Sequence, residues 1–136
     1  MPDTTTNLQL PYLLAGQAQK HVTHNEALRL LDALVQIAVV DRHLTTPPAS
    51  PVDGARYIVA AGGAGAWAGW DLNIAYRVDG AWIRLVPRPG WLAWVQDEAA
   101  LLVWSGSAWT EVGAGSGGAA AFATLGVGGA AADATN

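Results

Sequence analysis

The fold of this chain is decided by residues 17–40, QAQKHVTHNEALRLLDALVQIAVV, which show a sustained helical period. Thr23 is placed to be the N-cap of a helix, and Glu26 follows three residues later. The two side chains can then satisfy each other's free backbone N–H groups in a capping box. We therefore predict a helix that is capped at Thr23 and continues to about Val40, where a short strand over residues 39–44 begins.

Two kinds of side chain divide the surface of this predicted helix. Polar residues recur at spacings of four, three and four and form one narrow stripe: Asn25, Arg29, Asp32 and Gln36. Apolar residues fill most of the rest: Ala27, Leu28, Leu30, Leu31, Leu34, Val35, Ile37 and Ala38. A surface helix of a monomer usually has a narrower apolar stripe. The pattern predicts either a helix sunk into its own domain or an interface with a second copy, centred on Leu28, Leu31, Leu34, Val35 and Ala38.

The composition favours the second interpretation. The chain has 136 residues, enough for one compact domain with tails, and only 13% of them are charged. That share is about half of the usual one, so small polar groups or partner proteins must cover the surface. The net charge of −4 and the lack of a Lys/Arg cluster argue against a nucleic-acid partner.

Targeting and redox signals are missing from the sequence. It contains no cysteine, which excludes a disulfide framework and thiolate chemistry. The first residues lack the basic and apolar regions of a signal peptide. The longest apolar run is interrupted by Asp32, Gln36 and Asp41, so no membrane insertion is expected.

The chain divides into three parts. Residues 1–16 form an extended N-terminal arm, in which Leu8, Leu10 and Tyr12 alternate as in a short strand or an arm that lies on a partner. Residues 17–112 form the folded domain, with a Pro-rich linker over residues 45–54. Residues 113–136 are a Gly/Ala-rich tail, which by itself is a flexible tether to a fibre or a partner.

The period falls to two from Arg56 onward, which predicts short strands. Asp79-Gly80 is a strong hairpin signal between residues 73–78 and 81–86. Ala108-Trp109 opens a strand after a Gly turn, just as Ala81-Trp82 does, so a weak repeat links the two hairpins. We predict a small antiparallel, Trp-rich β meander packed on the helix, which gives an α+β fold.

The sequence offers little for catalysis. His21 and His24 have a spacing that could bind a metal, but no third ligand shares their face. Glycoside hydrolysis would need two positioned carboxylates, and Asp71, Asp79, Asp97 and Glu98 are available. Asp79 is a turn residue, Asp97-Glu98 are best interpreted as solvated loop charges, and no catalytic or cofactor motif is present. We expect no enzyme activity, no cofactor and no metal site.

Seven tryptophans lie in the second half of the chain. Trp67, Trp70 and Trp91 are flanked by Gly or Pro in predicted loops, so they are the exposed candidates for stacking on sugar rings. Packing in the core or at an interface between subunits fits them equally well. The other four lie in strand patterns and are expected in the core: Trp82, Trp94, Trp104 and Trp109.

Residues 16–28, GQAQKHVTHNEAL, resemble the signature of a domain family of unknown function found in prophage proteins and gene transfer agents. The segments 51–59, 65–69, 79–82, 89–91 and 106–109 are similar to the β part of that family. The resemblance covers roughly residues 7–112. It implies a virion structural protein of the head-spike and tail-fibre type, and for this chain a head-spike base.

The resemblance and the helix together predict a homo-oligomer on the capsid of a phage-like particle, assembled in the bacterial cytoplasm. A pentamer is favoured because a capsid vertex is fivefold, and a trimer is the alternative because fibres are usually threefold. The expected partners are a capsid protein and a spike fibre protein, and the particle would aid contact with the host surface. The competing hypothesis is a carbohydrate-binding module for host capsule or surface polysaccharide.

Overall fold

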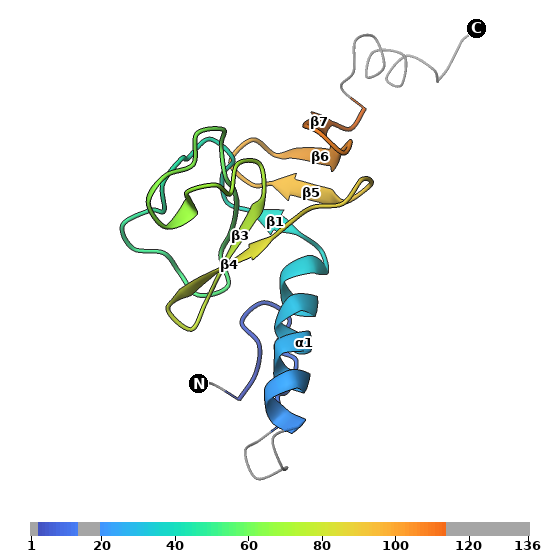
Figure 1. Cartoon of the computed structure of the whole chain (residues 1–136). Helices are drawn as coiled ribbons and strands as arrows, with labels where there is room; N and C mark the ends of the chain where they lie inside the picture. Colours follow the sequence, from blue (N-terminus) through green and yellow to red (C-terminus); the bar gives the residue numbers. More distant parts are fainter. Residues whose placement is uncertain (1–2, 14–19, 114–136) are drawn as a thin grey trace, which may run out of the picture.

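The computed structural model describes residues 3–13 and 20–113, which form one helix and two small sheets (Figure 1). The helix α1 spans Lys20–Leu34, and a short 3-10 turn, η1, spans Gly65–Trp67. The strands are β1 Ala38–Val39, β2 Arg56–Ile58, β3 Ile74–Val78, β4 Ala81–Leu85, β5 Leu92–Val95, β6 Ala100–Trp104 and β7 Trp109–Glu111. The predicted α+β class is confirmed. The predicted tail lies outside the described residues from position 114 onward.

The strands are divided between two sheets. One has the order β2-β3-β4 and is antiparallel, and the other has the order β1-β5-β6-β7. The two predicted hairpins therefore lie in different sheets. Pro87 and Pro89 separate β4 from β5, and because proline lacks an N–H group they cannot continue the β3–β4 ladder.

Strand β1 connects the sheets at one edge. It pairs with β5 in parallel, a pairing that the sequence did not predict. Just after β1, the Val40 N–H donates to the Arg56 carbonyl at 2.8 Å, and the Ile58 N–H donates to the Asp41 carbonyl at 3.2 Å. Residues 38–41 therefore contact both sheets, although the strand itself is shorter than the predicted residues 39–44.

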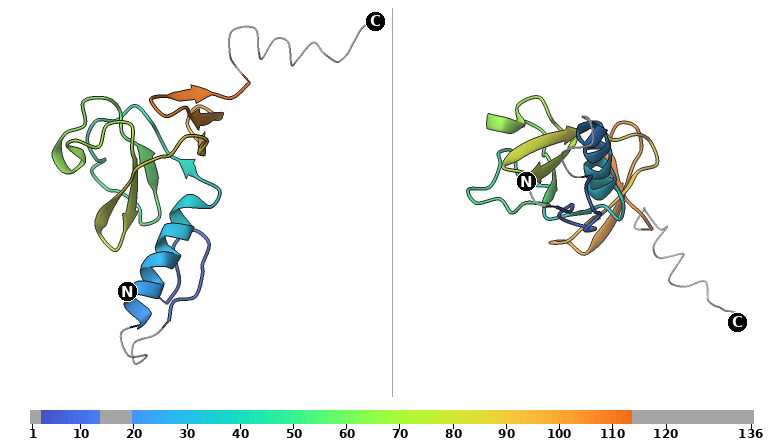
Figure 2. Two further views of the ribbon diagram at one scale, coloured as in Figure 1. Left: turned by 45° about the vertical axis from the view of Figure 1, so that its right-hand side comes forward. Right: turned by 90° about the horizontal axis from the view of Figure 1, so that it is seen from below.

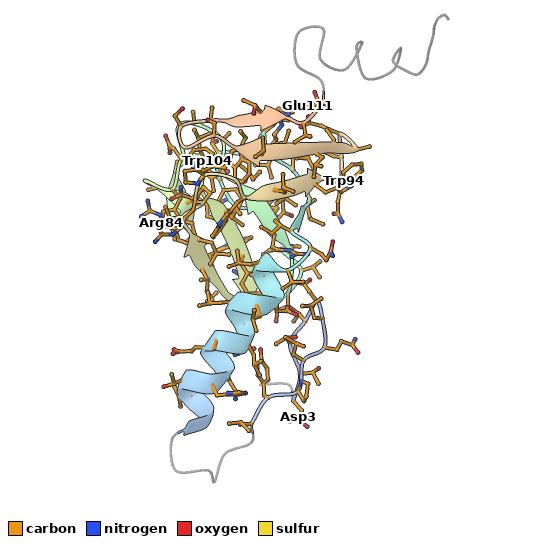
Figure 3. The ribbon with its side chains drawn as sticks, turned by 90° about the vertical axis from the view of Figure 1, so that its right-hand side faces the viewer. Asp3, Arg84, Trp94, Trp104 and Glu111 are labelled. Atoms are coloured by element: carbon orange, nitrogen blue, oxygen red, sulfur yellow. The ribbon has the colours of Figure 1, made fainter. Side chains whose placement is uncertain are left out.

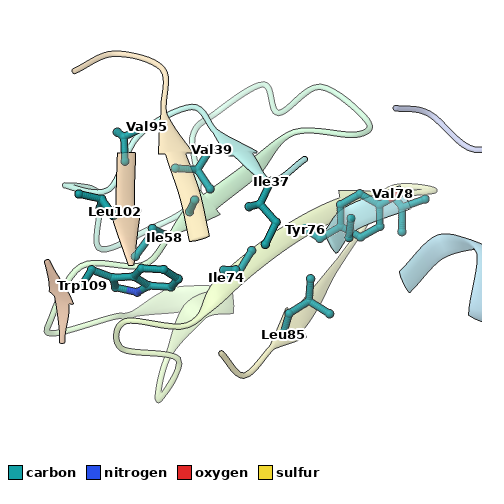
Figure 4. Close-up of a cluster of buried hydrophobic side chains, with 12 residues drawn as sticks. Ile37, Val39, Ile58, Ile74, Tyr76, Val78, Leu85, Val95, Leu102 and Trp109 are labelled. Carbon is teal, nitrogen blue, oxygen red and sulfur yellow. The ribbon is translucent and has the colours of Figure 1, made fainter. Parts of the chain in front are cut away.

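The main core lies between the two sheets (Figure 4). The four-stranded sheet contributes Val95, Leu102 and Trp109, and the three-stranded sheet contributes Ile74 and Tyr76 among others. The Trp109 indole also donates from Nε1 to the Leu72 carbonyl at 2.8 Å. A second, smaller cluster on the other side of β2 and β3 consists of Tyr57, Val59, Trp67 and Ala75.

Both ends of α1 differ from the prediction. The helix includes Thr23, so the capping box predicted at Thr23 is wrong. No Gly or Pro occurs between Lys20 and Thr23, so nothing in this sequence prevents the helix from beginning before Thr23. The helix ends at Leu34 rather than near Val40, because Gln36 takes a left-handed conformation with φ 54°. The Arg56 guanidinium, which donates to the Ala33 carbonyl at 2.9 Å, then satisfies the free helix end.

The helix projects from the β body instead of lying flat on a sheet (Figure 2). Within α1, the side chains that pack on the main core are those of the last turn, Ala33 and Leu34. Along the rest of its length α1 runs beside the N-terminal arm. This arrangement leaves one side of α1 without cover from the described residues.

Candidate functional site

The arm, residues 3–13, forms a tight hairpin-like loop along α1 (Figure 1). The Thr5 N–H donates to the Leu10 carbonyl, and the Tyr12 N–H donates to the Asp3 carbonyl, both at 2.9 Å. These bonds fix the shape of the arm. Its attachment to α1 comes from the polar stripe of the helix.

Asp32 makes the central contact of this attachment. Its side chain is fully buried, and it accepts hydrogen bonds from the backbone N–H groups of Asn7 at 2.8 Å and Leu8 at 2.5 Å. The Tyr76 hydroxyl of β3 donates to the same carboxylate at 3.0 Å. One helix side chain thus binds the arm and the three-stranded sheet together.

The charge of Asp32 is stabilised by these donors. Burial raises the pKa of the Asp32 carboxyl, but the hydrogen bonds that it accepts from the arm and from Tyr76 lower it by more, so its pKa lies below the usual value. Burial, together with the carboxylate beside it, raises the pKa of Tyr76 to about 12. Asp32 is therefore ionised and Tyr76 is a hydrogen-bond donor at neutral pH.

Asn25 and Arg29 extend the attachment along the helix. The Asn25 side chain is 4% exposed and pairs with both backbone groups of Leu13, at 2.8 and 2.9 Å. Arg29 donates to the Tyr12 hydroxyl at 3.2 Å and forms an ion pair with Asp79. The polar stripe of α1 therefore faces its own chain, and the apolar side faces outward.

The apolar side of α1 is the candidate site. We define the outer face as Ala27, Leu30 and Leu31 of α1 together with Val35, the residue after the helix, whose N–H still donates to the Leu31 carbonyl at 2.9 Å. Leu30, Leu31 and Val35 are 45%, 51% and 41% exposed. Of the described charged side chains of α1, Arg29 and Asp32 turn toward the arm, whereas the exposed Glu26 lies at the edge of this face, one turn before Leu30. An outward apolar and inward polar helix is the reverse of what a monomer needs.

The structure places the five predicted interface residues in two environments. Leu31 and Val35 lie on the outer face. Leu28 is half-buried, and Leu34 and Ala38 are half-buried where α1 meets β1. Leu30 was not among the five, although it is one of the more exposed apolar side chains. Sequence reasoning missed it because the packing of the arm sets the orientation of the helix.

An apolar groove continues this surface beyond the C-terminal end of α1. It has a volume of about 720 Å³, and its lining is Leu34, Gln36, Ile37, Ala38, Gly90, Trp91, Leu92, Trp94 and Leu101. Its floor is the outward side of the four-stranded sheet, where Ala38, Trp94 and Leu101 form one cross-strand row. Figure 3 shows Trp94 on this sheet, beyond the end of α1.

The alternation of β5 explains why the groove is apolar. Ala93 and Val95 point into the core, so Leu92 and Trp94 must point outward, and they are 50% and 44% exposed. The lining contains no charged side chain, and Gln36 is its one polar side chain. The outer face and the groove thus have the same uncharged, apolar character.

Residues 24–110 of the chain match a protein family of unknown function, DUF2793. The protein belongs to this family. The match begins inside α1 and ends in β7, so it includes the outer face and the groove but not the arm. Comparison with curated proteins gives no match.

The three tryptophans predicted to be exposed in loops lie in different environments of this DUF2793 domain. Trp67 is fully buried, with its ring centroid 5.5 Å from that of Tyr57 and 5.1 Å from that of Trp82, so its expected exposure is wrong. Trp70 is half-buried against the same small cluster, whereas Trp91 packs against the main core. The loop around Trp67 folds inward because this large side chain covers the outer side of β2 and β3.

Trp94 is more exposed than predicted, whereas Trp67 is more buried. It was expected in the core, but the strand alternation places it in the groove beside Trp91. A sugar site needs several convergent polar groups besides aromatic faces, and this groove offers one polar side chain, Gln36.

The carboxylates of the β part have structural contacts. Asp71 accepts hydrogen bonds from the N–H groups of Gly62 and Gly63, both at 2.9 Å. Glu98 accepts two hydrogen bonds from Arg42, at 2.8 and 2.9 Å. In the part of the chain that the structure describes, no group of three His, Asp or Glu residues could hold a metal ion, and no helix is long and apolar enough to span a membrane.

Proposed function

We propose that this protein is a non-enzymatic structural component of a phage-like particle, a head-spike base that forms a homo-oligomer. The observation that carries the proposal is the orientation of α1. Its buried Asn25 and Asp32 face the arm, while Leu30, Leu31 and Val35 face solvent. Soluble monomers rarely keep contiguous apolar patches of this kind exposed.

Association has a clear physical source. Burial of one exposed leucine side chain contributes about 1.5–3 kcal/mol when it is complete. The outer face offers two leucines and Val35, each already about half buried, and the groove adds Leu92 and Trp94. The lining of the groove carries no charged side chain, and the one acid beside the outer face, Glu26, is exposed at its edge, so little charge has to be desolvated on association.

The particle setting rests on the resemblance of residues 16–28 and of the β part to prophage and gene transfer agent proteins. In this proposal a ring, pentameric in preference to trimeric, binds a capsid protein. The Gly/Ala-rich residues that follow Gly113 lead to a spike fibre protein. A closed ring uses one repeated contact and leaves no apolar end exposed.

The test is the native mass of the protein, measured by light scattering over a dilution series. We expect a stable oligomer for the natural sequence and a loss of association of at least tenfold for Leu31→Glu, which places a charge in the buried contact. The matched control is Val52→Glu, because Val52 is 71% exposed and belongs neither to the outer face nor to the lining of the groove. A natural protein that is monomeric at every concentration would contradict the proposal.

A further inference from the structure

We infer that the groove between the end of α1 and β5 receives the outer face of α1 from a second copy of this chain. This inference rests on the proposed oligomer and specifies which two surfaces meet in it. The lining of the groove includes Leu34 of α1, Trp91, and Trp94 of β5.

The lining of the groove determines the chemistry of its occupant. Leu92, Trp94 and Leu101 offer apolar contact, and the absence of charged side chains among the lining residues gives nothing to pair with an ion. A charged or strongly polar occupant would lose its hydration without compensation. The occupant must therefore present a convex, uncharged and apolar surface.

The outer face of α1 has these properties. Helical geometry makes it convex, and Leu30 and Leu31 are adjacent on it and about half exposed. Thr23 and His24 extend the face toward the start of the helix, and the exposed Glu26 borders it one turn before Leu30. The apolar side chains of one surface can thus fill the hollow of the other, as ridges fill grooves between packed helices.

The two surfaces also adjoin each other in one chain. Leu34 lines the groove and lies one turn after Leu30 and Leu31, so the outer face leads into the groove without an intervening charge. A neighbouring copy can therefore cover both. Because the outer face and the groove are different surfaces, the same contact can repeat from one copy to the next around a closed ring.

The test uses one variant of each surface. Leu31→Glu disables the outer face and leaves the groove intact, whereas Trp94→Glu disables the groove and leaves the outer face intact. Circular dichroism and thermal unfolding establish that each variant is folded. Leu92→Glu is the second groove variant, because Leu92 is 50% exposed and its replacement leaves the core untouched.

We expect each variant alone to be monomeric at concentrations at which the natural protein is an oligomer. An equimolar mixture of the two variants should form a complex of two chains, because one intact outer face meets one intact groove. Leu31→Glu mixed with Val52→Glu,Leu31→Glu is the matched control, and it should stay monomeric because both chains lack the outer face.

Two results would overturn the inference while leaving the proposed oligomer in place. One is that either groove variant, Trp94→Glu or Leu92→Glu, associates as strongly as the natural protein. The other is a mixture of the two surface variants that remains monomeric, which would show that an intact outer face does not bind an intact groove. A monomeric natural protein would overturn the proposed function as well as the inference.

Discussion

At the scale of single residues, Asp32 determines which way the helix faces. Its carboxylate is fully buried and accepts hydrogen bonds from two N–H groups of the arm and from the Tyr76 hydroxyl. The positive charge of Arg56 lies close enough to attract the Asp32 carboxylate, and the Arg56 guanidinium also donates to the Ala33 carbonyl. Because a buried charge is stable only with such partners, the position of Asp32 fixes the rotation of α1 about its axis.

Replacement of this carboxylate should destabilise the fold. Asp32→Asn removes the charge and turns an amide N–H₂ toward groups that are themselves donors, so we expect a loss of about 2–4 kcal/mol in the free energy of unfolding at neutral pH. Urea unfolding followed by circular dichroism measures the loss. Asp97→Asn is the matched control, because Asp97 is exposed and its change should stay within about 0.5 kcal/mol.

The same pair of proteins gives a pH dependence. The pKa of Asp32 is lowered in the folded state, so the unfolded chain binds the proton first as the pH falls. The stabilisation is therefore complete above the usual carboxyl pKa of about 3.9 and is lost as the pH falls through the lower, folded value. The stability difference between the natural protein and Asp32→Asn should narrow in that range, and a constant difference would contradict the assignment.

At the scale of elements, the hairpin of β3 and β4 shows that local sequence can set strand register when the turn requires specific backbone angles. Asp79 and Gly80 both have positive φ, 52° and 74°, as a two-residue hairpin turn requires. The register follows from the turn, with Val78 opposite Ala81 and Tyr76 opposite Ile83. This register places the Tyr76 side chain in the core, where its hydroxyl reaches Asp32.

Substitutions at Gly80 test this dependence on backbone conformation. A side-chain Cβ at Gly80 would meet nothing within 4 Å, so the cost of Gly80→Ala comes from its φ of 74° alone. We expect Gly80→Ala to lower the free energy of unfolding by about 1 kcal/mol. Gly80→Asn should lower it by less, because asparagine tolerates the left-handed region better. If Gly80→Ala and Gly80→Asn lose the same free energy of unfolding in urea, the left-handed conformation at Gly80 is not the cause of the loss.

At the scale of the whole molecule, the two sheets depend on one shared core. Residues of both sheets line the main cluster, and the bond from the Trp109 indole to the Leu72 carbonyl joins β7 to the loop before β3. Each sheet buries its apolar side against the other, so loss of one sheet would expose the core residues of both. The domain should therefore unfold as one cooperative unit.

The prediction at this scale is a single unfolding transition. Tryptophan fluorescence and far-ultraviolet circular dichroism should give the same urea midpoint. Trp109→Phe should lower that midpoint, because it removes the indole N–H that donates to the half-buried Leu72 carbonyl, at a cost of about 0.5–1.5 kcal/mol. The two signals should still coincide. Trp104→Phe, at the half-buried residue opposite Trp109, is the control and should cost less. Two separate transitions would show that the sheets fold independently.

The sequence by itself determined the elements whose causes are local. The helical period around Asn25 and Asp32, the Asp79-Gly80 hairpin and the period-two strands are all present as predicted, because each depends on neighbouring residues. The α+β class followed from these elements. Membership of a family of unknown function was also indicated by short motifs in the sequence.

Only the tertiary structure decided how these elements face one another. The helix period shows that polar and apolar sides exist, but the docking of the arm on Asn25 and Asp32 decides that the polar side is the buried one. In the same way, the parallel pairing of β1 with β5 turns Trp94 outward and buries Val95. Such choices depend on contacts between residues far apart in the chain, which no local period encodes, and they create the apolar surface on which the proposed assembly rests.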